Sequence, residues 1–374
     1  MTVVTAAVVE EAGGPMVLRD LRLDDPRADE LRVRMVACGI CQTDAHVRDQ
    51  HIPMPLPAVL GHEGAGIVEA VGSAVTEFSP GDHVVMSYRS CGACRPCRQG
   101  AVYYCDDILP LNFGGRRADG SNSLSETGDA GREVSGQFFG QSSFATQIIA
   151  NQQNAVKVDP SVPLDLLAPL GCGIQTGFGA VLNALKVAPG SRIAIFGCGA
   201  VGLAAIMASA IAGAATIIAI DRNRDRLALA LDIGATHGIH ADSEDVCRRI
   251  GNICGAVDYS VEAVGHPDLV RCAVDVLAPL GVAGLVGTMP PGATAPVEVM
   301  KLLLGRTVRG IHQGDAVSKL LIPKMVDFYK AGRLPLERLV RFYPFEAINT
   351  AFSDAARGEV VKPVLRFELK GEVA

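Results

Sequence analysis

Short runs of apolar and β-branched residues, separated by turns rich in glycine and proline, make up the first part of the chain. We expect strands at these runs, over residues 6–10, 31–37, 64–71 and 83–86. The sequence Ser79-Pro-Gly-Asp82 predicts a turn before the last of them. This pattern predicts a small, irregular, mostly β domain that ends near residue 170. The polar, glycine-rich stretch from Leu109 to Gly140 is expected to be an excursion from that domain rather than a domain of its own.

From about Ile174 the pattern changes, because short apolar runs now alternate with helical periodicity. The expected strands are residues 192–196, 216–220, 256–262 and 281–286. Short buried strands that alternate with helices are typical of a parallel sheet covered on both faces. After about residue 313 the character is mixed again, and a last strand is expected over Pro363 to Glu368.

One apolar stretch needs a separate interpretation, because Ile193 to Ile220 contains no charged residue. Its length exceeds the roughly 20 residues that cross a bilayer as a helix. However, four glycines interrupt it and its middle is rich in alanine rather than leucine. We therefore expect a strand, a glycine turn, a buried helix and a second strand.

The composition limits the classes of function. The chain has 374 residues, too many for one ordinary core, so two domains are expected. Its formal net charge is −6 and no basic patch is present, so nucleic acid and membrane surfaces are not expected partners. Met1 to Gly14 predicts a first strand rather than a signal peptide, and a cytoplasmic protein is expected. In that reducing compartment, eleven cysteines indicate metal binding rather than a disulfide framework.

The first chemical motif is a glycine turn, Gly197-Cys-Gly199-Ala-Val-Gly202, between an apolar strand and an alanine-rich helix. Alone the motif is weak, but its context is that of a dinucleotide-binding loop. Gly197 permits the tight turn, Gly199 lets a pyrophosphate approach the backbone, and Gly202 lets the helix lie close to the strand. The free N–H groups at the start of the helix then face the phosphates.

Asp221, at the end of the next strand, is expected to accept hydrogen bonds from the adenosine ribose. Its carboxylate would repel a 2′-phosphate, so NAD is favoured over NADP. Arg222 and Arg226 act against this preference, since nearby arginines admit NADP at some sites. The alternative is an ordinary glycine turn followed by a solvated aspartate.

Four cysteines lie within fifteen residues on a segment rich in glycine and proline: Cys91, Cys94, Cys97 and Cys105. Four thiolates around one ion form a closed tetrahedral zinc site, in which no position remains for water or substrate. Such a site has a structural role. An iron–sulfur cluster is the alternative, although nothing else in the chain indicates electron transfer.

Three further metal-ligand candidates, Cys41, His62 and Cys172, are far apart in sequence. Taken singly, each has an ordinary interpretation. Cys41 could be a core thiol or form a redox pair with Cys38, His62 could be a core histidine, and Cys172 could be a small apolar residue between two glycines.

The segments around these residues resemble those of the zinc-dependent medium-chain alcohol dehydrogenases. The resemblance is carried by Gly39-Ile-Cys41-Gln-Thr43-Asp44-Ala-His46, Gly61-His62-Glu63-x-x-Gly66, the four-cysteine segment, Gly171-Cys172-Gly173 and the glycine turn with its aspartate. It extends over essentially the whole chain. A narrower similarity, to aryl- and allylic-alcohol dehydrogenases, rests on Leu111-Asn-Phe-Gly-Gly115 and Phe138-Phe-Gly-Gln-Ser-Ser143.

The resemblance implies that Cys41, His62 and Cys172 hold a catalytic zinc ion with one open position, so that each subunit binds two Zn²⁺. It further implies roles for the neighbouring residues. Asp44 would hydrogen-bond the ligating imidazole, and Glu63 would be a carboxylate that ligates the metal transiently. Thr43 would touch the substrate oxygen, and His46 would be the outer end of a proton relay. The alternative for His46 is an ordinary surface histidine.

Cofactor contacts are also implied. Thr176 would back the nicotinamide ring, and further contacts are expected from Val201, Arg226, Val286 and Lys362. Gln42 stands where some relatives have a basic residue at the pyrophosphate, and Lys362 stands where some have arginine. Because lysine lacks the bidentate fork of arginine, somewhat weaker NADH binding is expected.

The implied architecture is an α/β protein with two domains. Residues 1–173 and 313–374 would form a GroES-like, mostly β, catalytic domain, and residues 174–312 a doubly wound Rossmann domain. The function implied is hydride transfer between NAD(H) and a primary alcohol or aldehyde, and the expected substrate is aromatic or allylic. A homodimer joined through the Rossmann sheets is expected, with a tetramer as the alternative.

Two rival functions remain at this point. One is a formaldehyde dehydrogenase that depends on glutathione or mycothiol, for which Arg116 and Arg117 could anchor the thiol cofactor. The other is a non-catalytic NAD-binding structural or sensing protein. That protein would be expected to have lost the open metal site, yet its residues are all present.

Overall fold

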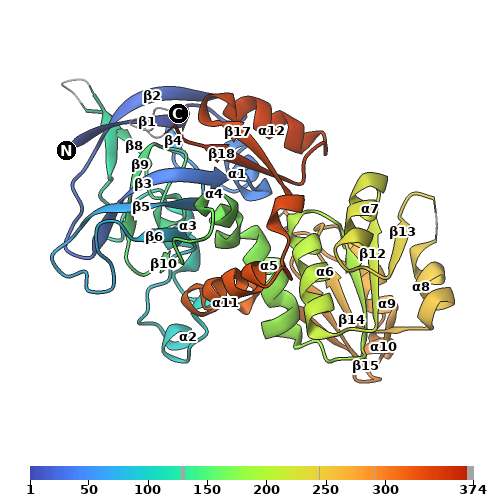
Figure 1. Ribbon diagram of the computed structural model, residues 1–374. Helices are drawn as coiled ribbons and strands as arrows, with labels where there is room; N and C mark the ends of the chain where they lie inside the picture. The colour runs from blue at the N-terminus through green and yellow to red at the C-terminus, as the bar shows by residue number, and fades with distance from the viewer. Residues whose placement is uncertain (128–130, 244, 291, 369–374) are drawn as a thin grey trace. The chain divides into compact units, whose positions relative to one another are not determined.

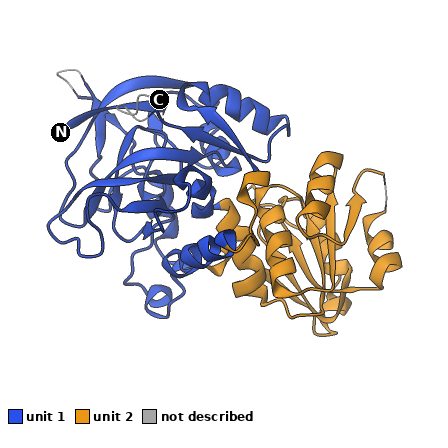
Figure 2. Cartoon of the chain, in the orientation of Figure 1, with its two compact units in different colours: residues 1–172, 317–330, 339–374 blue, residues 173–316, 331–338 orange. Residues whose placement is uncertain are grey.

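A computed structural model describes residues 1–127, 131–243, 245–290 and 292–368. The chain forms two compact units, coloured separately in Figure 2. Unit 1 comprises residues 1–172, 317–330 and 339–374, and unit 2 comprises residues 173–316 and 331–338. The first boundary lies one residue from the expected one and the second lies four residues from it. Residues 331–338 belong to unit 2, whereas we expected the whole tail in the catalytic domain.

Unit 1 contains two sheets, as its predicted β character requires (Figure 1). The strands of the five-stranded sheet are, in order, β4 (Ala58–Val59), β1 (Thr2–Val9), β2 (Met16–Leu23), β7 (Leu124–Glu126) and β8 (Glu133–Val134). The seven-stranded sheet has the order β10 (Ala155–Lys157), β6 (His83–Met86), β5 (Glu63–Val71), β3 (Glu30–Gly39), β18 (Lys362–Arg366) and β17 (Val340–Pro344), with β9 (Gln147–Asn151) also paired to β3.

Strand β3 is the centre of the seven-stranded sheet. Leu31, Val33 and Met35 are buried while the arginines between them are half-buried, which is the period-two alternation of a strand with one face on the core. Its partners come from three parts of the chain, because β3 pairs with β5, β9 and β18. The C-terminal strand β18 thus completes a sheet that begins near the N-terminus.

Unit 2 is built on six parallel strands, β13 (His237–His240), β12 (Thr216–Asp221), β11 (Arg192–Phe196), β14 (Val257–Glu262), β15 (Leu277–Leu285) and β16 (Thr307–Gly310). If the six strands are numbered from 1 by their order in the chain, their order across the sheet is 3-2-1-4-5-6, which is that of a doubly wound Rossmann sheet. The crossovers run in opposite directions on the two sides of β11, which puts helices on both faces (Figure 1). The predicted fold class is confirmed.

Helices connect these strands. Unit 1 has α1 (Gln42–Arg48), α2 (Arg95–Arg98), α3 (Ile108–Phe113), α4 (Leu164–Leu167), α11 (Ser318–Lys330) and α12 (Ile348–Ala356). Unit 2 has α5 (Gly173–Gly179), α6 (Ala200–Ala212), α7 (Arg224–Asp232), α8 (Val246–Cys254), α9 (Pro267–Asp275) and α10 (Val299–Leu302).

The uncharged stretch from residue 193 to 220 forms β11, the glycine turn, α6 and β12, as predicted. Both strands and most of α6 are buried in unit 2. Across the described part of the chain, no single helix has the length and apolar character needed to cross a membrane. A bent pair of helices, over residues 164–171 and 173–185, meets that test by length and composition only.

The excursion from Leu109 to Gly140 is part of unit 1, as expected, but it contains more structure than a loop. Its strands β7 and β8 extend the five-stranded sheet, and its first residues belong to helix α3. Residues 128–130 of this stretch lie outside the described ranges.

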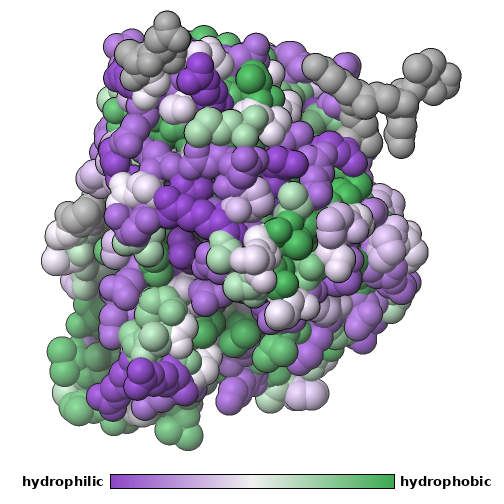
Figure 3. Space-filling model, turned by 90° about the vertical axis from the view of Figure 1, so that its left-hand side faces the viewer, coloured by the Kyte–Doolittle hydropathy of each residue, from purple (hydrophilic) through white to green (hydrophobic). Residues whose placement is uncertain are grey.

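On the face of the molecule in Figure 3, hydrophilic residues predominate and hydrophobic residues form small patches among them.

Candidate active site

Three elements of unit 1 bring the predicted ligands of the catalytic metal together. Cys41 lies where the end of β3 passes into α1 and is the N-cap of that helix. His62 immediately precedes β5, after the turn at Gly61, where φ is +89°. Cys172 is the last residue of the first segment of unit 1. The sequence separates these three side chains widely, and the seven-stranded sheet brings them into one cluster.

The ligand atoms of Cys41, His62, Glu63 and Cys172 all lie within 4.8 Å of one another. His62 Nε2 is buried and has no hydrogen-bond partner among the described residues. A buried polar nitrogen normally has a hydrogen-bond partner. An unpaired one beside two thiols is therefore suited to ligate a metal ion. Two sulfurs and one imidazole are the donor set of a catalytic zinc site that keeps an open position.

Asp44 fixes this geometry with a fully buried carboxylate on α1. One carboxylate oxygen, Oδ1, accepts hydrogen bonds from His62 Nδ1 and from the Gly61 backbone N–H, both at 3.0 Å. The other, Oδ2, accepts one from the Cys41 backbone N–H at 2.9 Å. Asp44 thereby orients the imidazole with Nε2 free for a metal and joins the two ligand segments.

The charges in the cluster also suit a cation. A hydrogen bond from the Cys172 thiol lowers the pKa of Cys41 well below its usual value, despite burial. Burial lowers the pKa of His62, but the Asp44 carboxylate and the Cys41 thiolate more than offset this and raise it to about 10. The site therefore attracts positive charge next to the thiolate, and metal binding replaces the proton with an ion.

Glu63 is held by a lysine from the other end of the chain. Lys362 Nζ donates to Glu63 Oε1 at 3.0 Å and Oε2 at 2.9 Å, and to the Ile40 backbone carbonyl at 3.0 Å. An ammonium has three donors, so all of them are used. In the structure this buried amine neutralises Glu63 beside the predicted metal ligands, and the expected contact between Lys362 and the cofactor stays a prediction.

The remaining residues of the resemblance lie on the same helix. The half-buried Thr43 hydroxyl is 3.8 Å from Cys41 Sγ, and half-buried His46 follows one turn later. Cys38 stays apart, because its thiol is free and directed to the Gly39 carbonyl at 3.5 Å. The redox-pair interpretation of Cys38 and Cys41 therefore has no disulfide to support it.

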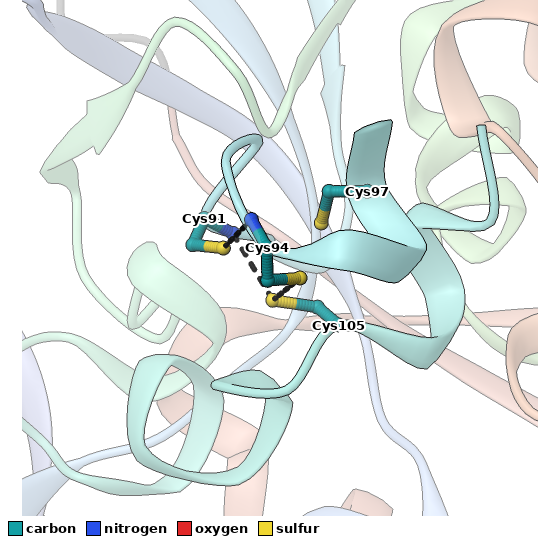
Figure 4. Close-up of side chains that lie close together, drawn as sticks. All are labelled: Cys91, Cys94, Cys97 and Cys105. Carbon is teal, nitrogen blue, oxygen red and sulfur yellow. Dashed lines mark hydrogen bonds between the residues drawn. The ribbon is translucent and has the colours of Figure 1, made fainter. Parts of the chain in front are cut away.

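The four-cysteine segment forms the second cluster, drawn in Figure 4. Cys91, Cys94, Cys97 and Cys105 have sulfurs within 4.8 Å of one another, around α2. Backbone N–H groups point at these sulfurs, from Cys94 to Cys91 Sγ at 3.3 Å and from Cys91 to Cys105 Sγ at 3.3 Å. Such N–H contacts stabilise thiolates, and four thiolates with no open position fit a structural zinc ion.

The glycine turn has the geometry that its motif predicts. Gly197 has φ of +95°, which favours glycine. A Cβ on Gly202 would lie 1.7 Å from the Gly197 carbonyl oxygen, so only glycine permits this approach of helix to strand. A Cβ on Gly199 would meet nothing within 4 Å, which leaves open space at the start of α6. The turn therefore fits a bound pyrophosphate.

Asp221 ends β12 beside this turn. Its carboxylate accepts hydrogen bonds from the Cys198 backbone N–H at 2.6 Å and the Asn223 backbone N–H at 2.8 Å. These bonds fix the side chain and leave further lone pairs for ribose hydroxyls. Nearby on α7, Arg226 Nε is buried without a hydrogen-bond partner among the described residues, which also fits a missing ligand.

Three other predicted cofactor residues also lie in unit 2. Thr176 is buried on α5, and Val201 is half-buried in the first turn of α6. Val286 follows β15, where its backbone N–H donates to the Glu262 carbonyl at 2.9 Å. Val201 and Val286 thus lie at the N-terminus of α6 and the carboxyl end of a strand, where dinucleotides bind in such folds.

Comparison with known proteins agrees with this geometry. Residues 27–160 match the alcohol dehydrogenase GroES-like domain, and residues 200–331 match the zinc-binding dehydrogenase family. Geraniol dehydrogenase from Castellaniella defragrans is 44% identical over 97% of each chain. The chain belongs to the zinc-dependent medium-chain alcohol dehydrogenases. The predicted resemblance, the NAD-linked enzyme class and the need for zinc are thereby confirmed.

Solved structures extend the comparison. Benzyl alcohol dehydrogenase from Acinetobacter calcoaceticus has a TM-score of 0.95 and 43% identity, covering 98% of this chain and 100% of that one. A zinc-binding-domain alcohol dehydrogenase protein from Burkholderia ambifaria has a TM-score of 0.96 and 50% identity, with the same coverage. This alcohol dehydrogenase therefore shares its whole architecture with both.

The two segments that carry the narrower resemblance pack together beside His62, a predicted ligand of the catalytic zinc. Phe139 stacks on His62 with ring centroids 4.5 Å apart, and Phe138 meets the same ring edge-on at 5.2 Å. Phe113 contacts both phenylalanines, at 5.9 and 5.2 Å. Phe138 and Phe139 are buried, so these ring contacts hold the imidazole within the core of unit 1.

The thiol-dependent rival loses its anchors in this structure. Arg117 is buried and donates to Glu30, Asp24 and the Asn122 carbonyl, so its guanidinium is part of the core of unit 1. Arg116 pairs with Glu133 at 2.9 Å. Neither arginine carries an unneutralised charge for a thiol cofactor, and the comparisons do not favour that function.

Two features of the dehydrogenase escaped sequence analysis. The Glu63–Lys362 pair joins residues 299 apart, and a lysine immediately before the expected last strand was the available signal for it. The second feature is a disulfide between Cys247 on α8 and Cys272 on α9, whose Cα atoms are 6.4 Å apart. Both cysteines lie in helical patterns without metal-ligand spacing, so nothing in the sequence distinguished them from core thiols.

Proposed function

We propose that this dehydrogenase oxidises primary aromatic or allylic alcohols to aldehydes with NAD, at a zinc site formed by Cys41, His62 and Cys172. The observation that carries the proposal is the unpaired, buried His62 Nε2 within a cluster of two cysteine sulfurs. The substrate class is supported by two relatives named for geraniol and benzyl alcohol, at 44% and 43% identity. The phenylalanines that surround His62 supply an apolar environment of matching character.

The residues have separate tasks in this reaction. When bound, zinc would supply Lewis acidity that favours loss of the alcohol proton, and NAD would supply the hydride acceptor. Thr43 Oγ1 receives that proton and passes it on, and His46 carries it away from the buried site. Asp44 keeps the His62 imidazole in one orientation, and Lys362 keeps the Glu63 carboxylate neutralised nearby.

The test combines a substrate panel with metal-site variants. We expect NADH formation, followed by absorbance, to be faster with benzyl and allylic alcohols than with short aliphatic alcohols. Cys41→Ser and His62→Ala should abolish it and remove one zinc ion, whereas Cys38→Ala, a change at a neighbouring buried thiol, should retain both. Equal turnover in all three variants would refute the site, and a preference for aliphatic alcohols would refute the substrate class.

We also propose a homodimer joined through β16. This strand is the outermost of the six in the parallel sheet of the described residues, a position at which a further strand can be added. Exposed apolar residues gather beside it, with Leu280, Val299, Met300, Leu303 and Leu304 all more than half exposed. An edge strand with apolar neighbours suits pairing with a second copy through a two-fold axis.

Solution mass tests the dimer. Light scattering after gel filtration should give twice the chain mass of 39.1 kDa for the parent protein. Leu303→Glu should give the monomer, whereas Leu320→Glu, at an exposed leucine on α11 in unit 1, should not change the mass. A monomeric parent, or a variant that stays dimeric, would contradict the proposed interface.

A further inference from the structure

His46 has a neighbour that can extend the proton relay. Its Nδ1 lies 3.4 Å from Nδ1 of His51, and the two ring centroids are 5.7 Å apart. A hydrogen bond between two imidazole nitrogens requires a proton on one of them only, so either ring can donate to the other. His46 is half-buried and His51 is exposed, so the pair leads outward.

The backbone after α1 creates this pair. Helix α1 ends at Arg48, and Gln50 then takes a left-handed conformation, with φ of +56°. That conformation is unfavourable for a residue that has a side chain. It turns the chain back so that the Ile52 backbone N–H donates to the His46 carbonyl at 3.2 Å. The turn thereby returns His51 to the side of a residue five positions earlier.

The charged group that interacts with both histidines is the Asp49 carboxylate, which pairs with Arg48. Arg48 donates to Asp49, which lowers the pKa of that carboxyl, and both histidines lower it further. Asp49 therefore presents a permanent negative charge to both rings, partly neutralised by Arg48. Asp44, on the buried face of the helix, is engaged by His62. A carboxylate beside two imidazoles stabilises a shared positive charge while a proton passes between them.

We propose that His51 is the outer acceptor of a two-histidine relay, in which His46 receives the alcohol proton at Nε2 and releases the proton on Nδ1 to Nδ1 of His51. This inference rests on the proposed function. Each alcohol oxidation yields an aldehyde, NADH and one proton. Once His51 releases a proton from Nε2 to water, both rings are neutral again but each is in its other tautomer, and proton exchange with water returns them to the starting tautomers before the next turnover. The direct contact is Nδ1 to Nδ1, which leaves Nε2 of each ring for the next partner.

The relay is tested in the first turnover, so that product release does not hide it. Stopped-flow NADH formation and indicator-detected proton release are measured with benzyl alcohol from about pH 6 to about pH 10, the range in which imidazole and then hydroxide serve as acceptors. For His51→Gln we expect the first turnover to be roughly tenfold slower than in the parent near pH 6. Near pH 10 the two rates should be equal. Added imidazole should restore the rate in His51→Ala.

Two matched variants and one independent measurement complete the design. His237→Gln removes an exposed histidine of unit 2, and Gln50→Gly keeps the left-handed turn, so both should follow the parent profile. In NMR titrations without substrate, the His46 curve should shift in His51→Gln and not in His237→Gln. The relay alone would be overturned if His51→Gln had the pH profile of the parent. It would also be overturned if the variant lost the same fraction of the first-turnover rate at every pH and added imidazole did not restore the rate in His51→Ala. Absence of alcohol turnover in the parent would overturn the proposed function as well.

Discussion

Asp44 joins two ligand segments through one carboxylate, and Asp44→Asn tests how much the metal site depends on it. The carboxylate accepts from His62 Nδ1, from the Gly61 N–H and from the Cys41 N–H, at 2.9–3.0 Å. Asparagine has one acceptor oxygen and one NH₂ donor in nearly the same shape. Wherever its oxygen lies, the NH₂ group must face at least one of these donors.

The cost follows from that mismatch. If the amide oxygen keeps the His62 bond, the buried Cys41 N–H loses its partner, which costs about 1–3 kcal/mol. The remaining bonds also weaken, because their acceptor is no longer charged. We expect the loss to appear as catalytic zinc affinity reduced by about 10- to 100-fold, the usual effect of removing a partner of a ligating imidazole. That factor corresponds to about 1.4–2.8 kcal/mol.

Competition with a chromogenic chelator measures this affinity, and the four-cysteine site provides an internal reference in the same molecule. We expect Asp44→Asn to release its first zinc ion at a lower chelator concentration, while release of the second is unchanged. Asp49→Asn is the matched control, since Asp49 pairs with Arg48 rather than with His62. Identical release curves for Asp44→Asn and the parent would refute the reasoning, and equal weakening of both sites would indicate general destabilisation instead.

Three other outcomes test separate parts of the structure. Arg117→Met leaves Glu30 buried without its cation and should cost about 3–5 kcal/mol of unfolding free energy in urea titrations, whereas Arg116→Met, at an exposed pair, should cost about 0–1 kcal/mol. In Gly202→Ala the added Cβ would meet a backbone oxygen at 1.7 Å, so NADH binding, followed by fluorescence, should weaken at least about tenfold while zinc content is unchanged. Cys94→Ser should lower the zinc content by about one ion per subunit and make the segment around α2 sensitive to trypsin, as judged by mass spectrometry of the fragments.

Local patterns of apolar and polar residues predicted the elements and the class of sheet. This was possible because the burial of a strand determines the pattern of apolar residues within that strand alone. Strands β6 and β11 have the predicted bounds, while β15 begins four residues earlier than expected, at Leu277. Leu277 pairs with Val257 across a register irregularity, which a single strand's pattern does not contain. The pairing of β18 with β3 was likewise not predicted, since strand order depends on contacts between distant segments.

The same limit applies to the candidate site. The predicted ligand residues could be named because the short segments around them resemble those of the zinc-dependent medium-chain alcohol dehydrogenases. The partner of Glu63 could not, because Lys362 reaches it from the opposite end of the chain. His51 was missed for a different reason: its position depends on the left-handed backbone of Gln50, a conformation that glutamine rarely adopts.

The place of β18 in the seven-stranded sheet has a consequence for biosynthesis. A ribosome adds about 5–20 residues per second, so β3 emerges many seconds before the strand that pairs with its end. During that interval the backbone groups of Ala37, Cys38 and Gly39 lack their native partner. Glu63 also waits for Lys362, 299 residues later. The nascent chain therefore exposes an interior sheet edge next to Cys38 and Cys41 until residues 362–366 have been synthesised, and we expect chaperones to bind it during this interval.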